Sequence, residues 1–486
     1  MALAKRFKQL DHFSLETTGA YNLLPFNFHK LTAEKYFCAN LVGEHLFLTQ
    51  QELKKLVGGT LPTSSDTYLE LKSKHFLYGL DSDAAIDLLA LKFRTKHHRI
   101  AQFTALHIFV VTLRCDYTCQ YCQVSRRMED EGDFDMSHES AEASLEMLFL
   151  SPAKSVKIEF QGGEPLLNFE LIKFIVETAL AKNISHQKNL EFVVTTNLSM
   201  LDEDVLDFCE VHGIYLSTSL DGPKDLHNRN RPKASRNGYE TTVAGIRRIQ
   251  ERIGPDKISA LMTTTAASIE MPREIIDTYV ELKFHSIFLR PLSPYGFAIK
   301  TKQAAKYNSE RWLEFFKEGL DYIIELNQAG YFLVEQYTRI ILRKLLTAEN
   351  PGYVDLQSPA GIGISVIVYN YDGDVYASDE ARMLKEMGDE KFRLGNVHND
   401  TYEQIFSADS LLEGLEETLV ESVPMCSECG YQTLCGSDPV YHYATQGDVV
   451  GKKPLSFFCN KNMGVITHIL NLLQEPKTRK TLESWI

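Results

Sequence analysis

The 486-residue chain contains no long hydrophobic run. No stretch approaches the ~18 apolar residues that a membrane-spanning helix requires, although hydrophobic residues make up 44% of the sequence. The first thirty residues hold no apolar segment and no cleavage-like site of a secretory signal. We therefore expect a cytoplasmic protein with no membrane partner.

Positive charge is outnumbered by negative charge. The chain has 51 lysine and arginine residues against 65 aspartate and glutamate residues, and its formal net charge is −14. A protein whose main task is to bind a phosphate backbone carries the opposite balance. We therefore expect no nucleic-acid partner, whereas a neutral or basic peptide partner remains compatible with this charge.

Cysteine is nearly absent outside two tight groups, which hold seven of the nine cysteines. In a chain that is not exported, grouped cysteines indicate metal ligation rather than disulfides. The other two, Cys38 and Cys209, fall on strand and helix patterns. We expect them to be buried core residues.

The first group follows the apolar run His107–Leu113 and has the spacing Cys-x3-Cys-x2-Cys. Its members are Cys115, Cys119 and Cys122. Three thiolates can hold three irons of a [4Fe–4S] cube and leave the fourth iron open to bind and reduce a ligand. The alternatives are incidental core thiols, or three ligands of a zinc ion whose fourth ligand is His107 or His138.

After residue 100, β-rich runs alternate with amphipathic helical patterns. The expected strands are His107–Leu113, Ser155–Gly163, Glu191–Asn197, Ile214–Gly222, Ile258–Thr265 and Ser286–Leu292. The expected helices are Glu139–Leu150, Phe169–Ala181, Asp202–His212, Tyr239–Arg252 and Arg273–Lys283. This alternation predicts an α/β fold with a parallel sheet, in the form of a partial (β/α)6 barrel. Chemistry in such sheets gathers at the C-terminal strand ends.

The remaining regions differ in pattern. Asn27–Leu31 and Lys35–Leu48 predict a hairpin, followed by helices at Gln50–Val57, Asp66–Phe76 and Asp83–Lys96. This small winged-helix-like unit resembles leader-peptide recognition domains, which capture a peptide as an added strand. The alternative is a plain N-terminal cap on the barrel.

A length of 486 residues predicts two to four domains. We divide the chain into the peptide-recognition-like residues 1–100, the barrel 101–300, a helical bridge 301–350 and a C-terminal region 351–486. The bridge rests on Tyr331–Leu346 and on Glu310–Leu326. The latter carries apolar residues at helical spacing, namely Trp312, Phe315, Phe316, Leu320, Ile323 and Ile324.

The turn Gly162-Gly163-Glu164-Pro165 follows the second expected strand. Its two glycines let the backbone approach a ligand, and its carboxylate or carbonyls can accept from an ammonium group. At this distance from the cysteine triad, the turn matches a motif of the radical S-adenosylmethionine (SAM) enzymes, which this chain resembles. The resemblance implies that the triad holds the SAM-binding cluster and that Gly162, Gly163 and Glu164 hold the methionyl amino group.

Further cofactor contacts are implied by the same resemblance. Tyr121 stands where the family places an aromatic residue against the adenine. Thr196, Asn197 and Ser219 end the third and fourth strands and are placed near the ribose or methionyl part of SAM, although each could equally be a cap or turn residue. Arg231 is suited to a charge-assisted bond with the SAM carboxylate.

Two neighbouring features accompany Arg231. It lies in His227–Pro232, where Asn228 replaces the family's usual aspartate. Arg290, at the end of the sixth expected strand, is a further candidate to face the site. The implied chemistry is one-electron cleavage of SAM, after which a 5′-deoxyadenosyl radical abstracts hydrogen from an unactivated carbon. It requires an electron donor such as flavodoxin or ferredoxin.

The second cysteine group contains Cys426, Cys429, Cys435 and Cys459. Without context, this spacing indicates structural zinc. In context it resembles the SPASM domain of peptide maturases, which has seven cysteines. Here Ala360, Ser378 and Pro439 occupy the positions that serve its inner cluster. We therefore predict two [4Fe–4S] clusters, one that binds SAM and one auxiliary.

Asp379 occupies a place where some sulfatase-maturing relatives have a catalytic acid or base; the alternative is a solvated turn carboxylate. Other stretches, such as Tyr21–Phe28 and Phe288–Ala298, resemble the maturases of the His-Xaa-Ser system. The expected function is oxidative side-chain crosslinking of a ribosomally made precursor peptide. The alternatives are redox-neutral epimerisation and a non-catalytic iron–sulfur protein that binds peptides.

Overall fold

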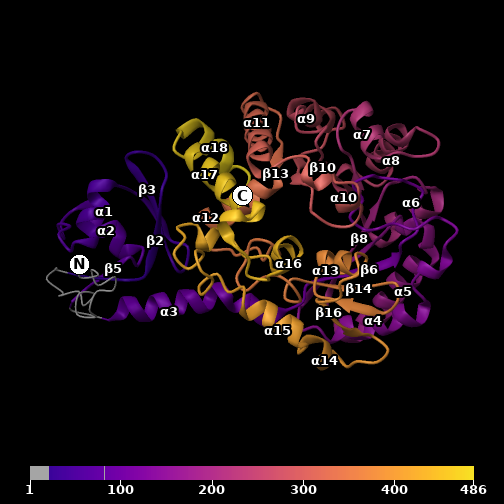
Figure 1. The fold of residues 1–486 in the computed structure, drawn as a ribbon, viewed down its shortest axis with the longest axis horizontal. Coiled ribbons are helices and arrows are strands. Elements are labelled where there is room, and N and C mark those ends of the chain that lie inside the picture. Colours follow the sequence, from indigo (N-terminus) through magenta and orange to yellow (C-terminus); the bar gives the residue numbers. More distant parts are fainter. Residues whose placement is uncertain (1–20, 81–82) are drawn as a thin grey trace, which may run out of the picture. The chain divides into compact units, whose positions relative to one another are not determined.

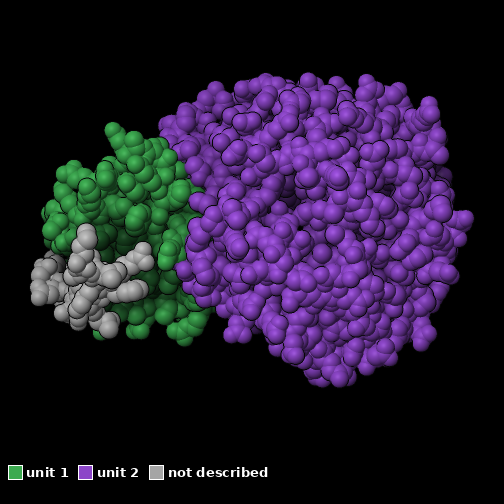
Figure 2. Space-filling model, in the orientation of Figure 1, with its two compact units in different colours: residues 1–97, 428–433 green, residues 98–427, 434–486 purple. Residues whose placement is uncertain are grey.

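The computed structural model describes residues 21–80 and 83–486. The chain forms two compact units, which are coloured separately in Figure 2. Unit 1 comprises residues 1–97 and 428–433, and unit 2 comprises residues 98–427 and 434–486. The division into four parts proposed from the sequence stays a prediction.

Unit 1 contains a three-stranded antiparallel sheet and a two-stranded one. The first has the order β2-β3-β4, with bounds Phe26–Lys30, Lys35–Asn40 and His45–Thr49; the second pairs β1 (Tyr21–Leu23) with β5 (Leu77–Gly79). The helices are α1 (Gln50–Val57), α2 (Asp66–Ser73) and α3 (Ala84–His97). Cys38 is fully buried in the core of this unit, as predicted.

The expected strand Lys35–Leu48 is wrong in one respect, because a turn breaks it into β3 and β4. The side-chain oxygen of Asn40 accepts hydrogen bonds from the backbone N–H groups of Val42 (3.2 Å) and Glu44 (3.1 Å). Gly43 adopts a φ of 90°, which favours glycine. The Asn40 side chain thus closes a turn that interrupts the strand predicted over Lys35–Leu48.

Unit 2 is built on a nine-stranded sheet (Figure 1). Six neighbouring parallel strands form its first part: β6 (Leu106–Thr112), β7 (Ser155–Gly162), β8 (Asn189–Thr196), β9 (Tyr215–Ser219), β10 (Ile258–Thr264) and β12 (Leu289–Pro291). The predicted α/β fold with a parallel sheet is confirmed. The last expected strand is split, because β11 (Ser286–Ile287) pairs with β13 (Val334–Glu335) instead.

Helices connect these strands. They are α4 (His138–Leu150), α5 (Phe169–His186), α6 (Glu203–His212), α7 (Lys224–Asn230), α8 (Gly238–Arg252) and α9 (Pro272–Glu281). Only α7 was not predicted, because its polar sequence carries no apolar stripe. The predicted apolar stripe of α11 (Ser309–Gln328) is buried, and α12 (Gln336–Leu346) follows it.

The C-terminal part of unit 2 continues the same sheet. Strand β14 (Val366–Tyr369) lies parallel to β6 on the side opposite β7, and β15 (Asp374–Tyr376) and β16 (Arg393–Asn396) follow in antiparallel order. The other helices are α10 (Phe297–Lys300), α13 (Asp379–Lys385), α14 (Tyr402–Phe406), α15 (Asp409–Glu416), α16 (Pro439–Gln446), α17 (Phe457–Leu472) and α18 (Pro476–Glu483). Among residues 21–80 and 83–486, no helix combines the length and the hydrophobicity of a membrane span.

Candidate active site

The three-cysteine loop leaves the C-terminal end of β6 and is held by backbone hydrogen bonds from distant segments. Cys115 N–H donates to Arg127 (3.2 Å), and Phe297 N–H donates to the Cys122 carbonyl (2.8 Å). Thr118 N–H donates to Pro232 (2.8 Å). The loop is therefore held by the residues that follow it, by the segment after α7 and by the start of α10.

A cavity of about 190 Å³ lies above this loop. Its walls include ten of the residues predicted for the SAM site: Cys115, Cys119, Cys122, Tyr121, Gly162, Gly163, Thr196, Asn197, Ser219 and Arg231. They come from the ends of β6, β7, β8 and β9 and from the residue after α7. Glu164 and Asp379 are not among the lining residues.

The triad suits a cluster better than a single ion. Within the described ranges, no three His, Cys, Asp or Glu side chains are arranged to hold one metal ion. A cube spreads three thiolates over three separate irons, so its ligands need not converge. The ring of His107, the alternative zinc ligand, instead bonds through both nitrogens, to Tyr369 Oη and the Thr104 carbonyl (3.1 Å each). Burial raises the pKa of the Cys119 thiol to about 12, so a cation is needed to hold its thiolate.

The two glycines serve the close approach of two backbone segments. A Cβ atom on Gly162 would lie 1.8 Å from the Thr112 carbonyl oxygen, and one on Gly163 would lie 2.2 Å from that of Arg114. The N–H groups of Gly163 and Glu164 donate to these same two oxygens (2.9 and 2.7 Å). The glycines thus bind the end of β7 to the start of the cysteine loop, in addition to lining the cavity.

We expect Gly163→Ala to disrupt this junction. The new methyl group meets backbone oxygens that cannot retreat without moving the cysteine loop, so the free energy of unfolding should fall by about 3 kcal/mol. Iron content should fall with it. The matched control is Gly132→Ala, because a Cβ there meets nothing within 4 Å. Thermal unfolding and iron analysis of both variants test this; equal iron content in both would contradict it.

Glu164 organises the end of β8 rather than facing the cavity. Its fully buried carboxylate accepts hydrogen bonds from the N–H groups of Leu166 (3.1 Å) and Asn197 (2.7 Å) and from Thr196 Oγ1 (2.6 Å). Burial raises the pKa of this carboxyl to about 7. In the described structure Glu164 positions Thr196 and Asn197, and its contact with the methionyl group stays a prediction.

Arg231 reaches the cavity as part of a buried charge pair. Its Nε lies 3.2 Å from the fully buried carboxylate of Asp221, which also accepts a 2.6 Å hydrogen bond from Tyr121 Oη. The guanidinium lies 5.3 Å from the centre of the Tyr121 ring, within cation–π range. One aspartate thus fixes both the cation and the aromatic ring of the predicted cofactor site.

A second pair of charges holds the cysteine loop beside Asn197. Asp116 accepts a hydrogen bond from Asn197 Nδ2 (2.8 Å) and pairs with Lys233 (3.1 Å). Asp116, Asp221 and Lys233 were not singled out from the sequence. The available signal for Asp221 was its place at the end of β9, in Leu-Asp-Gly, where chemistry gathers in parallel sheets.

Asp379 and Arg290 lie elsewhere. Asp379 pairs with the buried Arg382 (3.2 Å), which also donates to the Val124 carbonyl (3.3 Å). Its role as a catalytic acid or base stays a prediction. Arg290 is on β12, but it lines a second cavity, where it pairs with Glu380 (3.7 Å).

Three of the four C-terminal cysteines lie close enough to one buried lysine in unit 2 to act on its pKa. Cys426, Cys435 and Cys459 each act on the pKa of Lys453, which burial lowers and their charges raise. Asn462 Nδ2 lies 3.4 Å from Cys435 Sγ. Cys429 belongs to residues 428–433, which group with unit 1. Three positions where the SPASM domain has further cysteines hold other residues in this chain. Ser378 caps α13, Pro439 begins α16 and Ala360 is buried.

Comparison with known proteins identifies the class of this site. Residues 109–278 match the radical SAM superfamily, so the chain contains a radical SAM domain. This family implies a SAM cofactor and a [4Fe–4S] cluster. The chain is 22% identical over 382 residues to a cysteine-type anaerobic sulfatase-maturating enzyme of Clostridium novyi, covering 74% of this chain and 94% of that enzyme. A Clostridium perfringens enzyme of the same description is 25% identical over 341 residues, covering 66% and 84%.

Solved structures share the fold. The sulfatase-maturating enzyme anSMEcpe, solved with bound AdoMet and a Kp18Cys peptide, superimposes with a TM-score of 0.64 at 18% identity and covers 78% of this chain and 99% of that chain. Streptococcus suis SuiB bound to S-adenosylmethionine gives 0.53 at 14% identity, covering 88% and 98%. The assignment to the His-Xaa-Ser system in particular stays a prediction.

Proposed function

We propose that the chain is a radical SAM enzyme that oxidatively modifies side chains of a ribosomally made precursor peptide. The observation that carries this proposal is the single cavity that joins the three-cysteine loop to the glycine turn and to Arg231. Relatives whose descriptions name sulfatase maturation support a macromolecular substrate. The fold is also that of an enzyme solved with a bound peptide.

The residues of the cavity have distinct tasks in this proposal. Cys115, Cys119 and Cys122 ligate three irons, and Arg231 binds the SAM carboxylate while the Tyr121 ring packs against the adenine. When bound, the cluster and SAM supply a 5′-deoxyadenosyl radical that abstracts a hydrogen atom. The chain itself binds and orients the ligand through the residues that line the cavity.

One feature of the cavity favours oxidation over epimerisation. A redox-neutral epimerase needs a hydrogen donor such as a thiol beside the adenosyl group. The only cysteines that line the described cavity are the triad itself. Cys209, on α6, is buried and lies outside that lining. Crosslinking is therefore the leading reaction and epimerisation the alternative.

The four C-terminal cysteines are proposed to hold a fully ligated auxiliary cluster that accepts the electron released by substrate oxidation. Anaerobically reconstituted protein should then contain about eight irons per chain. About four irons with one zinc would assign this group to zinc, and about twelve would contradict the absence of an inner cluster.

The reaction is tested with the reduced protein, SAM and a precursor peptide encoded beside the gene. We expect formation of 5′-deoxyadenosine and a peptide that has lost two hydrogens per modification. An unchanged peptide mass with altered stereochemistry would support epimerisation. Intact SAM after reduction would leave only a non-catalytic binding role. Supplying electrons from flavodoxin or ferredoxin in place of a chemical reductant tests the proposed partner.

A further inference from the structure

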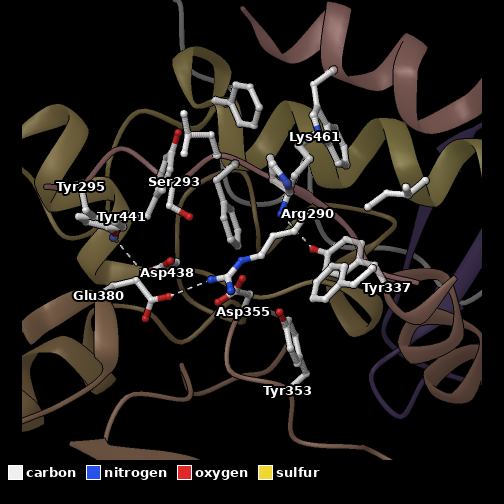
Figure 3. A pocket seen from close by; sticks show the side chains of 17 residues that line it. Arg290, Ser293, Tyr295, Tyr337, Tyr353, Asp355, Glu380, Asp438, Tyr441 and Lys461 are labelled. Carbon is white, nitrogen blue, oxygen red and sulfur yellow. Dashed lines mark hydrogen bonds and ion pairs between the residues drawn. The ribbon is translucent and has the colours of Figure 1, made fainter. Parts of the chain in front are cut away.

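Unit 2 contains a second cavity, of about 50 Å³, whose lining is drawn in Figure 3. Thr263 of β10 lines the first and is in register with Arg290 of the neighbouring β12, which lines the second. A hydrogen bond from Gln123 Nε2 to the Ser293 carbonyl (3.3 Å) joins the two linings. At about 10–15 Å³ for one water, the cavity has room for a side-chain headgroup rather than a larger molecule.

Charged groups from five segments meet in this cavity. Three carboxylates, those of Asp355, Glu380 and Asp438, face two cations, Arg290 and Lys461. Arg290 pairs with Glu380 (3.7 Å). No carboxylate of the described residues forms an ion pair with Lys461, whose ammonium donates to Tyr337 Oη (3.2 Å). The cavity thus has three carboxyl groups but only two cationic side chains, so one carboxyl group has no cation of its own.

Aromatic side chains form the walls of this second cavity, and one of them has a hydroxyl group that is available for a hydrogen bond. Phe288, Tyr337 and Tyr353 pack together with ring centres 5.8–6.4 Å apart. Such ring faces attract cations and disfavour anions. Tyr295 is only 1% exposed, and its hydroxyl has no hydrogen-bond partner in the part of the chain that is described. Tyr295 lines the same cavity as Asp438 and Glu380.

We propose that this cavity binds one singly cationic side chain of the peptide substrate and so holds a nearby residue of that peptide in the cofactor cavity. The inference rests on the proposed peptide-modifying function. A cation would neutralise the excess carboxylate and give the Tyr295 hydroxyl a donor to accept from. Burial raises the pKa of Glu380 to about 7, which a bound cation would lower again.

Binding can be measured without catalysis, because Trp312 lines the cavity and the chain has only two tryptophans. In the full-length, cluster-loaded Trp485→Phe protein, Trp312 is the remaining fluorophore. We would titrate acetyl-Gly-Arg-Gly-amide against the same peptide with citrulline, its neutral isostere, or with glutamate. We expect the arginine peptide to bind at least about tenfold more tightly than the citrulline peptide, as an added charge-assisted bond provides.

Variants assign that preference to the cavity. Glu380→Gln with Asp438→Asn should bring the arginine and citrulline affinities within about twofold, and asparagine preserves the N-cap of α16. The matched control is Glu416→Gln with Glu417→Gln, which removes two exposed carboxylates. Lys461→Met should act oppositely and strengthen arginine binding, because it removes the competing cation.

The proposal is overturned by equal affinity for the arginine and citrulline peptides, by preference for the glutamate peptide, or by loss of preference in the control pair alone. Agmatine separates a peptide from a free amine. Tighter binding of the peptide than of agmatine supports a peptide ligand, whereas tighter binding of agmatine than of the peptide overturns it. SAM cleavage measured without peptide reports on the proposed function independently.

Discussion

Cys119→Ala is expected to reduce the formation of 5′-deoxyadenosine to background. Cys119 lines the cofactor cavity as the middle member of the three-cysteine loop, and a cube with only two protein ligands is not retained. Iron should fall from about eight to about four per chain, because the auxiliary group keeps its own ligands. Anaerobic iron and sulfide analysis, together with chromatographic detection of 5′-deoxyadenosine, measure both effects.

Cys209→Ala is the matched control. This thiol is as buried as Cys38 and lies on α6, away from the cavity lining. Iron content and SAM cleavage should be retained, with only the modest loss of stability that a small core truncation causes. If Cys119→Ala kept both its iron and its activity, the three-cysteine loop would not be the cluster site.

Arg231→Met is expected to weaken both the fold and SAM binding. It leaves Asp221 fully buried without its cation, which costs about 3–5 kcal/mol of the free energy of unfolding. Losing a charge-assisted bond to the SAM carboxylate should raise the Kd by roughly 10–100-fold, or about 1.5–3 kcal/mol. Thermal unfolding and anaerobic equilibrium dialysis measure the two effects separately.

A double variant separates stability from binding. Asp221→Leu combined with Arg231→Met replaces the buried pair by apolar groups, which commonly restores stability. The unfolding temperature should recover in part, because the buried Tyr121 hydroxyl still lacks its Asp221 acceptor. The affinity for SAM should stay low because the cation is still missing. Recovery of the affinity in the double variant would show that Arg231 acts only through Asp221 and does not touch the cofactor.

The residues that line the cofactor cavity could be predicted from the sequence where they belong to short, recognisable motifs. The cysteine spacing and the glycine turn are each contained within eight residues, and both follow apolar runs that become β6 and β7. Because parallel strands place their C-terminal ends at one edge, two such segments meet without further knowledge of the fold. The parallel sheet followed from the same alternation.

The partners that position these residues were not predictable in this way. Asp221 meets Tyr121 across 100 positions of sequence, and Asp116 meets Lys233 across a similar distance. Periodicity reports which face of an element is buried but not which loop packs on it. The sequence also did not show why residue 163 must be glycine, because the backbone oxygens that exclude a side chain there belong to the cysteine loop.

The position of the Arg290 side chain could not be predicted from the sequence either. Its place after the sixth strand predicted a position beside the cofactor, but alternate residues of a strand point to opposite faces and the last strand is only three residues long. The guanidinium instead meets Glu380 from the C-terminal region. A charge on a short strand is placed by whichever segment packs over it.

The parallel pairing of β14 with β6 has a consequence for how the protein matures. The strand that carries the three-cysteine loop lies in the interior of the sheet, with β7 on one side and a strand some 260 residues later in the chain on the other. Such long-range pairing forms late and waits for synthesis of the distal segment. The sheet that carries the three-cysteine loop is therefore complete only once the distal segment has been synthesised.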